Sequence, residues 1–329
     1  MRMIVILITT LLGLFFSACS NAQESVVQRV FGRSVQAPVF IDCKALSSEK
    51  ILFQFSVPVA VKALHFSPHV DVAGIDDGAD VHVHLGQTLG AGERITADIL
   101  VEDAHRNSLN VLVSFRSRND RMPRLIITEL RTEYSKPRVE FVEFRTLSAG
   151  NLGALRLFIA GNGIDSPVFD FPPVEVAAGE YIVVHLRSIE EGIVDETGQN
   201  LGASGGTDAD PFARDFWVPD AKKVLRKTDA VFFTDQDDNI LDAVVLSENP
   251  DSWGTRQSIP LAVEMLYRKG AWSSASPEDA VASKGTTATR TISRDESLAN
   301  SRSARDWYIT ATGGSSAGRA NNPKRYEPK

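Results

Sequence analysis

Cysteine is scarce in this sequence, which holds only Cys19 and Cys43 among its 329 residues. Two cysteines cannot form a framework of disulfides, so the fold must depend on a hydrophobic core, and the length is sufficient for two domains. A surplus of basic residues is also missing, because the formal net charge is −7. An acidic chain without a basic face gives no support for a nucleic-acid partner.

Signatures of nucleotide binding and of nucleophilic catalysis are missing as well, since no Walker loop and no dinucleotide fingerprint occurs. Two strings match G-x-S-x-G, with Ser204 and Ser316 at their centres. A nucleophile elbow needs a strand before the serine and a helix after it, and neither string has both. Both strings are therefore interpreted as turns, and a hydrolase site built around Ser204 is kept as an alternative.

Long apolar runs are limited to one, from Ile4 to Phe16, which follows Arg2. The charge, the short apolar core and the small residues after it predict a secretory signal peptide over residues 1–18, too short to form a stable membrane span. The small residues before Cys19 resemble a bacterial lipobox, with Phe16 in place of the usual leucine. An ordinary cleaved signal with an incidental cysteine is the alternative.

The lipobox resemblance implies that Cys19 is acylated and that residues 19–34 form a tether to a membrane. Several acyl chains on one cysteine anchor a protein firmly. Ser20 after the cysteine is similar to enterobacterial lipoproteins of the outer membrane, on its periplasmic or surface face. Cys43 then has no intramolecular partner and is predicted to be a small buried hydrophobe.

Residues 35–122 are predicted to form a first β-sandwich. Short segments that alternate apolar and polar residues, separated by turn residues, are typical of this fold. The segments are ILFQFSV, VDVAGI, DVHVHL and NVLVSFRS. The phrase FSVPV at 55–59 and the turn from Asp103 to Leu109 resemble the bacterial Ig-like domains of S-layer and other exported proteins. Arg106 stands where that family has a glycine.

Residues 123–323 are predicted to form a second all-β unit, followed by a polar tail at 324–329. Its strands include VEFVEFRTL, ALRLFIAG, EYIVVHLR, AVFFTD and ILDAVVLS. Polar, glycine-rich and acidic stretches predict loop insertions near 188–227 and 248–284.

One or two short helices are expected near the end of the second unit. Ser258 to Lys269 places its apolar residues on one stripe and is followed by Gly270. The stretch SPEDAVA offers Ser276 as an N-cap and Asp279 three residues later, which approximates a capping box.

Four phrases of the second unit, in order, resemble the lamin-tail domain, an Ig-like β-sandwich that also occurs in exported bacterial proteins. They are IITELRTEYSKPRVEFVEF with Glu129, Glu140 and Glu143, then VAAGEYIVV, then DAVFFTDQDDNILDAVV with Asp242, and a closing run with Arg294, Asp306, Trp307, Gly318 and Asn321. Ala317 stands where the family has proline. The resemblance implies a scaffold or adhesion module, and the predicted parts fill nearly the whole chain.

Two pairs of residues are candidate centres of chemistry. His82 and His84 lie two apart, hence on one face of a strand, and a zinc or copper site would need Asp80 or Asp98 as a third ligand. Two histidines on a solvent-facing strand are the simpler interpretation. Glu140 and Glu143 are three apart, which places them on opposite faces of a strand and excludes a shared substrate.

Acidic residues suggest two ion sites. The stretch TDQDDNILDAVVLS begins as a calcium loop does, but Ile240 stands where the loop glycine belongs and Leu246 where the bidentate glutamate belongs. Asp238 and Asn239 tolerate positive φ, so a hairpin turn between two strands is the prediction. The acidic insertion at 188–227 is interpreted as a solvated loop, with ion binding as the alternative.

The fold class is therefore predicted as all-β, with two Ig-like β-sandwiches, and no catalytic, cofactor or metal residue is assigned. The predicted function is a lipid-anchored, non-enzymatic cell-envelope protein that binds a protein or glycan partner in adhesion or scaffolding. A hydrolase that uses the 188–227 insertion and a calcium- or transition-metal-binding protein are the alternatives.

Overall fold

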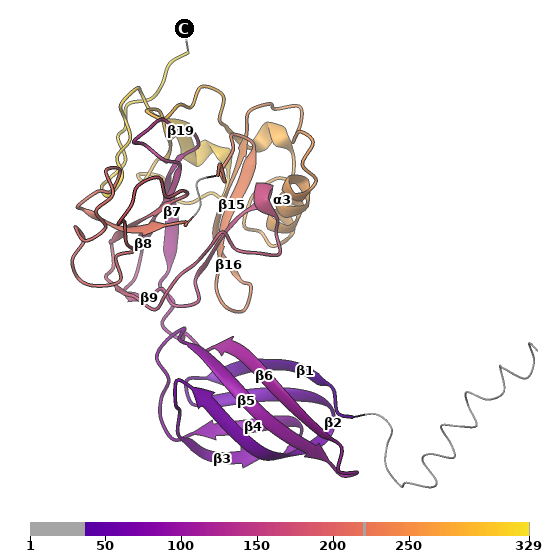
Figure 1. Cartoon of the computed structure of the whole chain (residues 1–329). Helices are drawn as coiled ribbons and strands as arrows, with labels where there is room; N and C mark the ends of the chain where they lie inside the picture. The colour runs from indigo at the N-terminus through magenta and orange to yellow at the C-terminus, as the bar shows by residue number, and fades with distance from the viewer. Residues whose placement is uncertain (1–36, 220–221, 329) are drawn as a thin grey trace, which may run out of the picture. The chain divides into compact units, whose positions relative to one another are not determined.

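The computed structural model describes residues 37–219 and 222–328, so the predicted signal peptide, Cys19 and the tether lie outside the described residues. Strands dominate the described chain, which holds a single α-helix and three short 3₁₀ turns (Figure 1). The predicted all-β class is confirmed. Among the described residues, no helix is long and apolar enough to cross a bilayer.

The chain divides into two compact units. Unit 1 contains the described residues up to Gly90 and Arg94–Arg118, and unit 2 contains Ala91–Glu93 and the chain from Asn119 onwards. Unit 1 is one six-stranded sheet in the order β3-β4-β2-β5-β6, with β1 also paired to β2. Its strands are β1 (Phe40–Ser47), β2 (Lys50–Ser67), β3 (Val72–Asp76), β4 (Gly78–Leu85), β5 (Arg94–Asp103) and β6 (Ser108–Arg116).

The strand β2 is 18 residues long and changes partners along its length. Residues 50–55 pair with β1 and β4, and residues 59–67 pair with β5, with register shifts in between. Side chains from both halves of β2, such as Phe53 and Phe66, enter one apolar cluster with residues of β4, β5 and β6. The sheet therefore folds over a single core, as a sandwich does. Cys43 is half-buried against this core, and burial raises the pKa of its thiol to about 12.

Unit 2 packs a six-stranded sheet, β14-β13-β8-β7-β18-β19, against a five-stranded sheet, β11-β10-β15-β16-β17, with the pair β12-β9 beside them. The strands are β7 (Leu125–Arg131), β8 (Phe141–Thr146), β9 (Gly150–Asn151), β10 (Arg156–Ile159), β11 (Phe169–Asp170), β12 (Glu175–Val176), β13 (Tyr181–His185), β14 (Ala213–Trp217), β15 (Asp229–Thr234), β16 (Ile240–Ser247), β17 (Val281–Ala282), β18 (Ile292–Arg294) and β19 (Trp307–Ile309).

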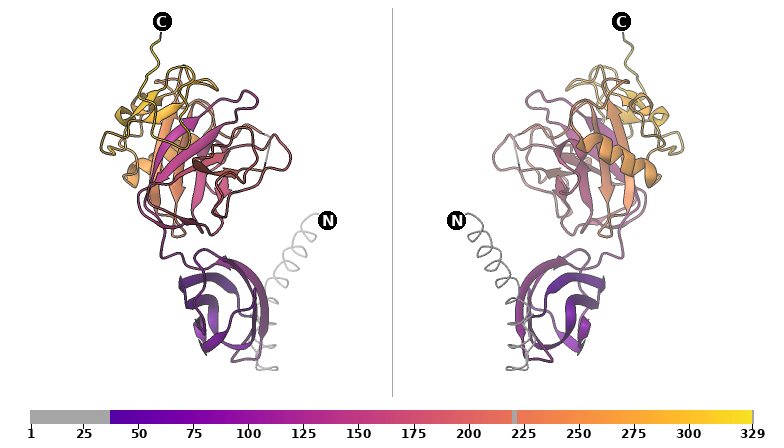
Figure 2. Two further views of the ribbon diagram at one scale, coloured as in Figure 1. Left: turned by 90° about the vertical axis from the view of Figure 1, so that its left-hand side faces the viewer. Right: turned by 90° about the vertical axis from the view of Figure 1, so that its right-hand side faces the viewer.

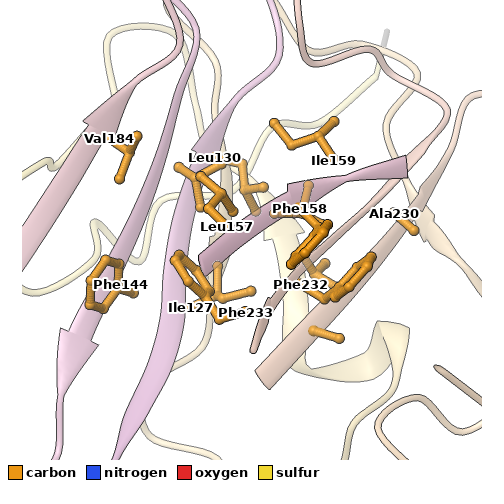
Figure 3. Packing of buried hydrophobic residues seen from close by; sticks show 14 of the residues in the cluster. Ile127, Leu130, Phe144, Leu157, Phe158, Ile159, Val184, Ala230, Phe232 and Phe233 are labelled. Carbon is orange, nitrogen blue, oxygen red and sulfur yellow. The ribbon is translucent and has the colours of Figure 1, made fainter. Parts of the chain in front are cut away.

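The core of unit 2 lies between its two larger sheets, where side chains from β7, β8 and β13 meet those from β10 and β15 (Figure 3). Phe144 and Phe233 lie between the sheets with their ring centroids 4.7 Å apart, whereas Phe158 stacks on Phe232 at 5.0 Å on the other face of the five-stranded sheet, towards α3. Burying aromatic rings of this size supplies much of the apolar free energy of a sandwich core.

The predicted helix at 258–269 is confirmed as α3 (Ser258–Arg268), which lies against the five-stranded sheet (Figure 2, right). Its apolar stripe, which includes Ile259, Val263 and Leu266, is buried in the core. The predicted capping box at Ser276 is wrong. The stretch forms only a three-residue 3₁₀ turn, Pro277–Asp279, in which Ser276 makes no side-chain cap bond.

Two segments with a sequence typical of irregular structure contain sheet structure. The expected loop insertion at 188–227 includes β14, whose five residues are all buried and which runs parallel to β13. The expected polar tail also continues the sheet, since Ala311 N–H donates to the Lys324 carbonyl at 2.8 Å and Tyr326 N–H donates to the Ile309 carbonyl at 2.8 Å. Both segments therefore cover edges of the six-stranded sheet.

Candidate functional site

The outer face of the six-stranded sheet in unit 2 carries ionisable side chains beside a small apolar cluster of Phe141, Val183 and Ala213. Strand alternation sends Val142, Phe144, Ile182 and Val184 into the core, so the intervening residues of β8 and β13 point to the other face. These outward residues include Glu143 and His185, and both are buried. Loops from residues 188–212 and 311–322 cover this face, joined to it by hydrogen bonds such as those of Asp208 with Arg131 and of Gly318 with Glu143.

Glu129 and Glu143 lie directly opposite each other on β7 and β8. Ser316 donates its N–H and its hydroxyl to Glu129 Oε2, each at 3.0 Å. Gly318 N–H donates to Glu143 Oε2 at 2.7 Å. Burial raises the pKa of both carboxyl groups, and for Glu143 the nearby Glu129 raises it further. These bonds hold residues 311–322, the closing segment of the chain, against the sheet.

Gly318 is required at this junction. Its φ of +79° lies in the left-handed region, and a Cβ there would lie 2.8 Å from Asp210 Oδ1 and 3.1 Å from the Ala213 nitrogen. Asn321 adds two bonds, from its side-chain amide to the carbonyls of Thr128 (2.8 Å) and Arg294 (2.9 Å).

A second group of ionisable residues lies beside this pair. Arg131 NH1 donates to Asp208 Oδ2 at 2.6 Å, and both side chains are largely buried. His185 Nε2 lies 2.7 Å from Asp215 Oδ1, and both residues have 1% exposure or less. Burial lowers the pKa of His185 to about 3 and raises that of Asp215 to about 8. Both shifts favour the neutral forms of the two hydrogen-bonded groups, because an isolated charge is expensive in such surroundings.

The His185 ring stacks on Trp217 with a centroid distance of 3.8 Å. Its Nδ1 atom has no hydrogen-bond partner among the described residues and lies 3.9 Å from Asp208 Oδ2. Trp217 Nε1 in turn donates to Ser204 Oγ at 2.6 Å. Ser204, 1% exposed, is thus a buried hydrogen-bond acceptor without access for a substrate.

A polar cavity of about 490 Å³ opens next to these groups. Its lining includes Arg131, Thr207 and Asp210 on one side and Ser315 and Arg319 on the other. Arg131 is 5% exposed, and its Nε atom has no partner among the described residues. The cavity therefore offers hydroxyl and guanidinium donors with two carboxylates nearby. This composition suits recognition of a polar ligand.

Another network lies inside the sandwich and joins its two sheets. Arg294 on β18 donates to the Ile127 carbonyl at 2.7 Å and to Asp242 Oδ2 on β16 at 2.9 Å. Its NH1 lies 3.7 Å from Asp306 Oδ2, and its guanidinium lies over Trp307 at 4.4 Å. Four residues singled out in the sequence thus come together, and every one of them is at least 93% buried.

The two histidines considered as metal ligands do not gain the third ligand that they would need. His84 Nε2 binds Asp76 Oδ2 at 2.8 Å, and Asp80 Oδ1 accepts a bond from Gln54 instead. Asp98 lies on β5 opposite His65. In the part of the chain that the structure describes, no group of three or more His, Cys, Asp or Glu side chains could hold a metal ion.

The acid-rich stretch at 234–247 is a hairpin between β15 and β16. Asp235 accepts bonds from the N–H groups of Asp237 (2.8 Å) and Asn239 (3.0 Å), and from the Asn239 side-chain amide (2.9 Å). Asp238 has φ of +60°, as expected for a turn residue. Both Asp235 oxygens are therefore engaged in the turn, and the hairpin prediction is confirmed.

The remaining carboxylates of the sequence analysis also hold the fold together. Glu140 accepts two bonds from Arg187 (2.6 and 2.5 Å), whereas Glu143 accepts the Gly318 N–H, so the two carboxylates have different partners. In the acidic insertion, Glu196 accepts the N–H groups of Ser204 and Asp215, each at 2.9 Å, and Asp195 accepts that of Trp217 at 2.8 Å. Glu196 and Asp195 thus accept N–H groups of β14 on the side where it has no neighbouring strand. The interpretation of the insertion as a solvated loop is thus wrong for Glu196, which is 1% exposed, whereas Asp195 is exposed as that interpretation predicts.

Sequence reasoning missed the pairing of Glu129 with Glu143 and that of Arg131 with Asp208. The available signal was the presence of single ionisable residues inside otherwise apolar strands, as in IITELR and FVEFRT. Such residues are rarely buried without a partner. The partners lie 14 and 77 residues away, and no sequence period links them.

Together, the fold and the site define a two-unit β-protein whose second sandwich has a polar network on its outer face. Residues 123–309 match the family TP_1001_2nd, described as a protein second domain, and the chain belongs to this family. An uncharacterized protein of Treponema pallidum (strain Nichols) is 29% identical over 126 residues, which are 38% of this chain and 32% of that protein. The chain thus aligns with about a third of that relative.

Among solved structures, the N-terminal part of the bacterial S-layer protein SbsC is similar at 12% identity. The likeness covers 64% of this chain and 44% of that one, with a TM-score of 0.25.

Proposed function

We propose that this protein is a lipid-anchored cell-envelope protein that acts as a non-enzymatic binding or scaffolding module. The signal sequence and the small residues before Cys19 support the anchor. The lamin-tail resemblance of the second unit supports the scaffolding role, because the residues that carry it form the buried networks around Arg294 and Gly318.

The observation that carries the non-enzymatic part is the use of reactive side chains as structural bonds. Ser204 is buried as an acceptor for Trp217, and Ser316 donates its hydroxyl to Glu129. A nucleophilic serine needs a hydrogen-bonded base and access to substrate. Among the described residues neither serine forms a hydrogen bond with a histidine, and both are at least 93% buried. These facts argue against the hydrolase alternative.

The polar cavity at Arg131 and Arg319 is the binding site that we assign to this module, with a glycan of the envelope as ligand. Its hydroxyl, guanidinium and carboxylate groups suit the alternating donors and acceptors of sugar hydroxyls. The cavity lies between the loop at 207–210 and the segment at 315–322. Both pack on the same sheet, which holds the lining residues in place.

The anchor is tested by metabolic labelling with a fatty-acid analogue. Cys19→Ala is expected to abolish the label, and Cys43→Ala, which removes the other cysteine, is expected to keep it. Fractionation of the same cells should move Cys19→Ala from the membrane to the soluble fraction. Label retained in Cys19→Ala would contradict the proposed anchor.

The binding role is tested by pull-down of envelope glycan fragments with the purified protein. Arg319→Ala is expected to reduce the captured fragments, because Arg319 lines the cavity. Arg325→Ala is a matched control, since both arginines are exposed to about the same degree (59% and 60%) and each pairs with one aspartate. Equal capture by the two variants would remove the cavity from the proposal.

A further inference from the structure

A second cavity in unit 2, of about 400 Å³, has a charge opposite to that of the whole chain. Six charged side chains line it, and four of them are basic. They are the basic Lys223, Arg226, Lys227 and Arg256 and the acidic Glu133 and Glu248. Two positive charges are therefore in excess among the side chains that line the cavity, in a chain whose formal net charge is −7.

The lysines of this cavity form only weak ion pairs. Lys223 Nζ lies 3.1 Å from Glu133 Oε1, and Lys227 Nζ lies 3.5 Å from Glu248 Oε1. The two lysine side chains are 39% and 24% exposed, so water screens both pairs. A ligand with a higher negative charge can compete with these carboxylates for the ammonium groups.

The guanidinium groups of the two arginines each donate one hydrogen bond to a backbone carbonyl, which leaves other N–H groups to donate to a ligand. Arg256 NH1 donates to the Gly161 carbonyl at 2.8 Å, and Arg226 NH1 donates to the Val224 carbonyl at 3.3 Å. A guanidinium carries five N–H donors, so each bond uses one and orients the rest.

Uncharged groups complete the lining. Thr228 Oγ1 accepts the Glu248 N–H at 3.0 Å, which leaves its hydroxyl hydrogen to be donated, and Thr255 adds a second hydroxyl. Trp253 is half-buried and packs against the core of unit 2, so it gives the cavity an apolar wall.

We infer that this cavity binds a phosphate group, either free or as a phosphate monoester. A dianion matches the two excess positive charges, and its oxygens match the ammonium, guanidinium and hydroxyl donors. A single carboxylate would leave one positive charge without compensation. All of these side chains belong to unit 2, and phosphate binding there does not depend on acylation of Cys19.

The test is isothermal titration calorimetry of the full chain carrying Cys19→Ala in a non-ionic detergent. Inorganic phosphate is expected to bind with a Kd of about 1 mM or lower, above the heat produced by sodium chloride at equal ionic strength. Glycerol 3-phosphate is the second probe. Tighter binding of the ester points to a phosphate monoester as the natural ligand, and equal binding points to free phosphate.

Variants locate the binding. Lys227→Ala and Arg256→Ala are each expected to weaken phosphate binding about tenfold. Arg268→Ala removes the same charge from the far end of α3, where Arg268 pairs with Glu264 in solvent, and is expected to bind as the wild type does. If Arg256→Ala unfolds, Lys227→Ala decides, because it breaks only an exposed pair. No saturable heat above sodium chloride, or equal weakening in Arg268→Ala, would overturn the inference.

Discussion

Unit 1 and unit 2 are both β-structures, but they bury different kinds of side chain. Among the described residues of unit 1, the buried polar ones are Asp103 and Ser117, and the core is apolar. Unit 2 buries charged networks both inside its sandwich, around Arg294, and on the outer face of its larger sheet. The fold of unit 1 is stabilised mainly by burial of apolar side chains. The fold of unit 2 also requires that each buried charged side chain is paired.

The aromatic residues give a way to observe the two units separately. All four tryptophans and all five tyrosines lie in unit 2, from Tyr134 to Tyr326. Three of the tryptophans, Trp217, Trp272 and Trp307, are buried. Intrinsic fluorescence therefore reports unfolding of unit 2, and hydrogen exchange of the strand amides can report unit 1.

The largest effect is expected for Arg294→Ala in unit 2. The change leaves Asp242 buried without its cation and removes the contact with Trp307, so the free energy of unfolding should fall by about 3–5 kcal/mol. Urea denaturation followed by tryptophan fluorescence measures it. Arg268→Ala is the matched control, because its exposed pair with Glu264 contributes less than about 0.5 kcal/mol. A similar loss in both variants would contradict the role given to the buried network.

In unit 1 the corresponding change is Ile99→Ala. Ile99 is fully buried in the core, so the variant should lose about 2–4 kcal/mol through lost apolar contacts and the cavity left behind. Hydrogen exchange measured by mass spectrometry should show faster exchange in β2, β4 and β5. Leu112→Ala on β6 is the control, since this side chain is 73% exposed and its loss should leave exchange unchanged. Unchanged exchange in Ile99→Ala would show that the apolar core does not set the stability of unit 1.

The dependence on pH should separate the units further, through Asp215. Burial raises its pKa from 3.8 to about 8, so the unfolded chain releases the proton at lower pH than the folded one. The contribution of Asp215 to the free energy of unfolding is thus fully present below about pH 4. This contribution is lost as the pH rises through about 8. Asp215→Asn imitates the protonated form, and its stabilising effect should grow by ~1–3 kcal/mol between pH 5 and pH 8.

The measurement for Asp215→Asn is urea denaturation by tryptophan fluorescence at both pH values. Asp251→Asn is the control, because Asp251 is exposed and the change should have the same small effect at both pH values. An Asp215→Asn effect that shrinks towards pH 8 would mean that Asp215 is ionised in the folded protein.

The sequence predicted the elements whose pattern is local. The alternation in DVHVHL places Val81 and Val83 in the core and the histidines on the other face, as β4 shows. The apolar stripe of α3 was also predicted. By contrast β14 was missed, because ARDFW is buried on both faces as a parallel strand is, and so shows no alternation.

The candidate site could not be predicted because its partners are set by register and by long loops. A register shift between Ile127 and Glu129 turns Glu129 towards Glu143. Loop closure then brings Asp208 to Arg131 and Ser316 to Glu129. These contacts join residues up to 187 positions apart, and neither propensity nor period fixes them.

The smallest effects are expected at two turns of the same form, one in each unit. Asp103 binds the N–H groups of residues 105 and 107 as Asp235 binds those of 237 and 239, and Arg106 (φ +65°) corresponds to Asp238 (φ +60°).

Arg106→Gly should stabilise unit 1 by about 0.5–1 kcal/mol, because glycine adopts positive φ without steric strain. Asp238→Gly should gain nothing, since aspartate tolerates this region and its carboxylate accepts a bond from Arg156 at 2.8 Å. Hydrogen exchange for unit 1 and fluorescence for unit 2 measure the two changes, with Arg106→Ala as a control that keeps the Cβ. If Arg106→Ala stabilises as much as Arg106→Gly, the gain does not come from the backbone angle, and the two turns differ for another reason.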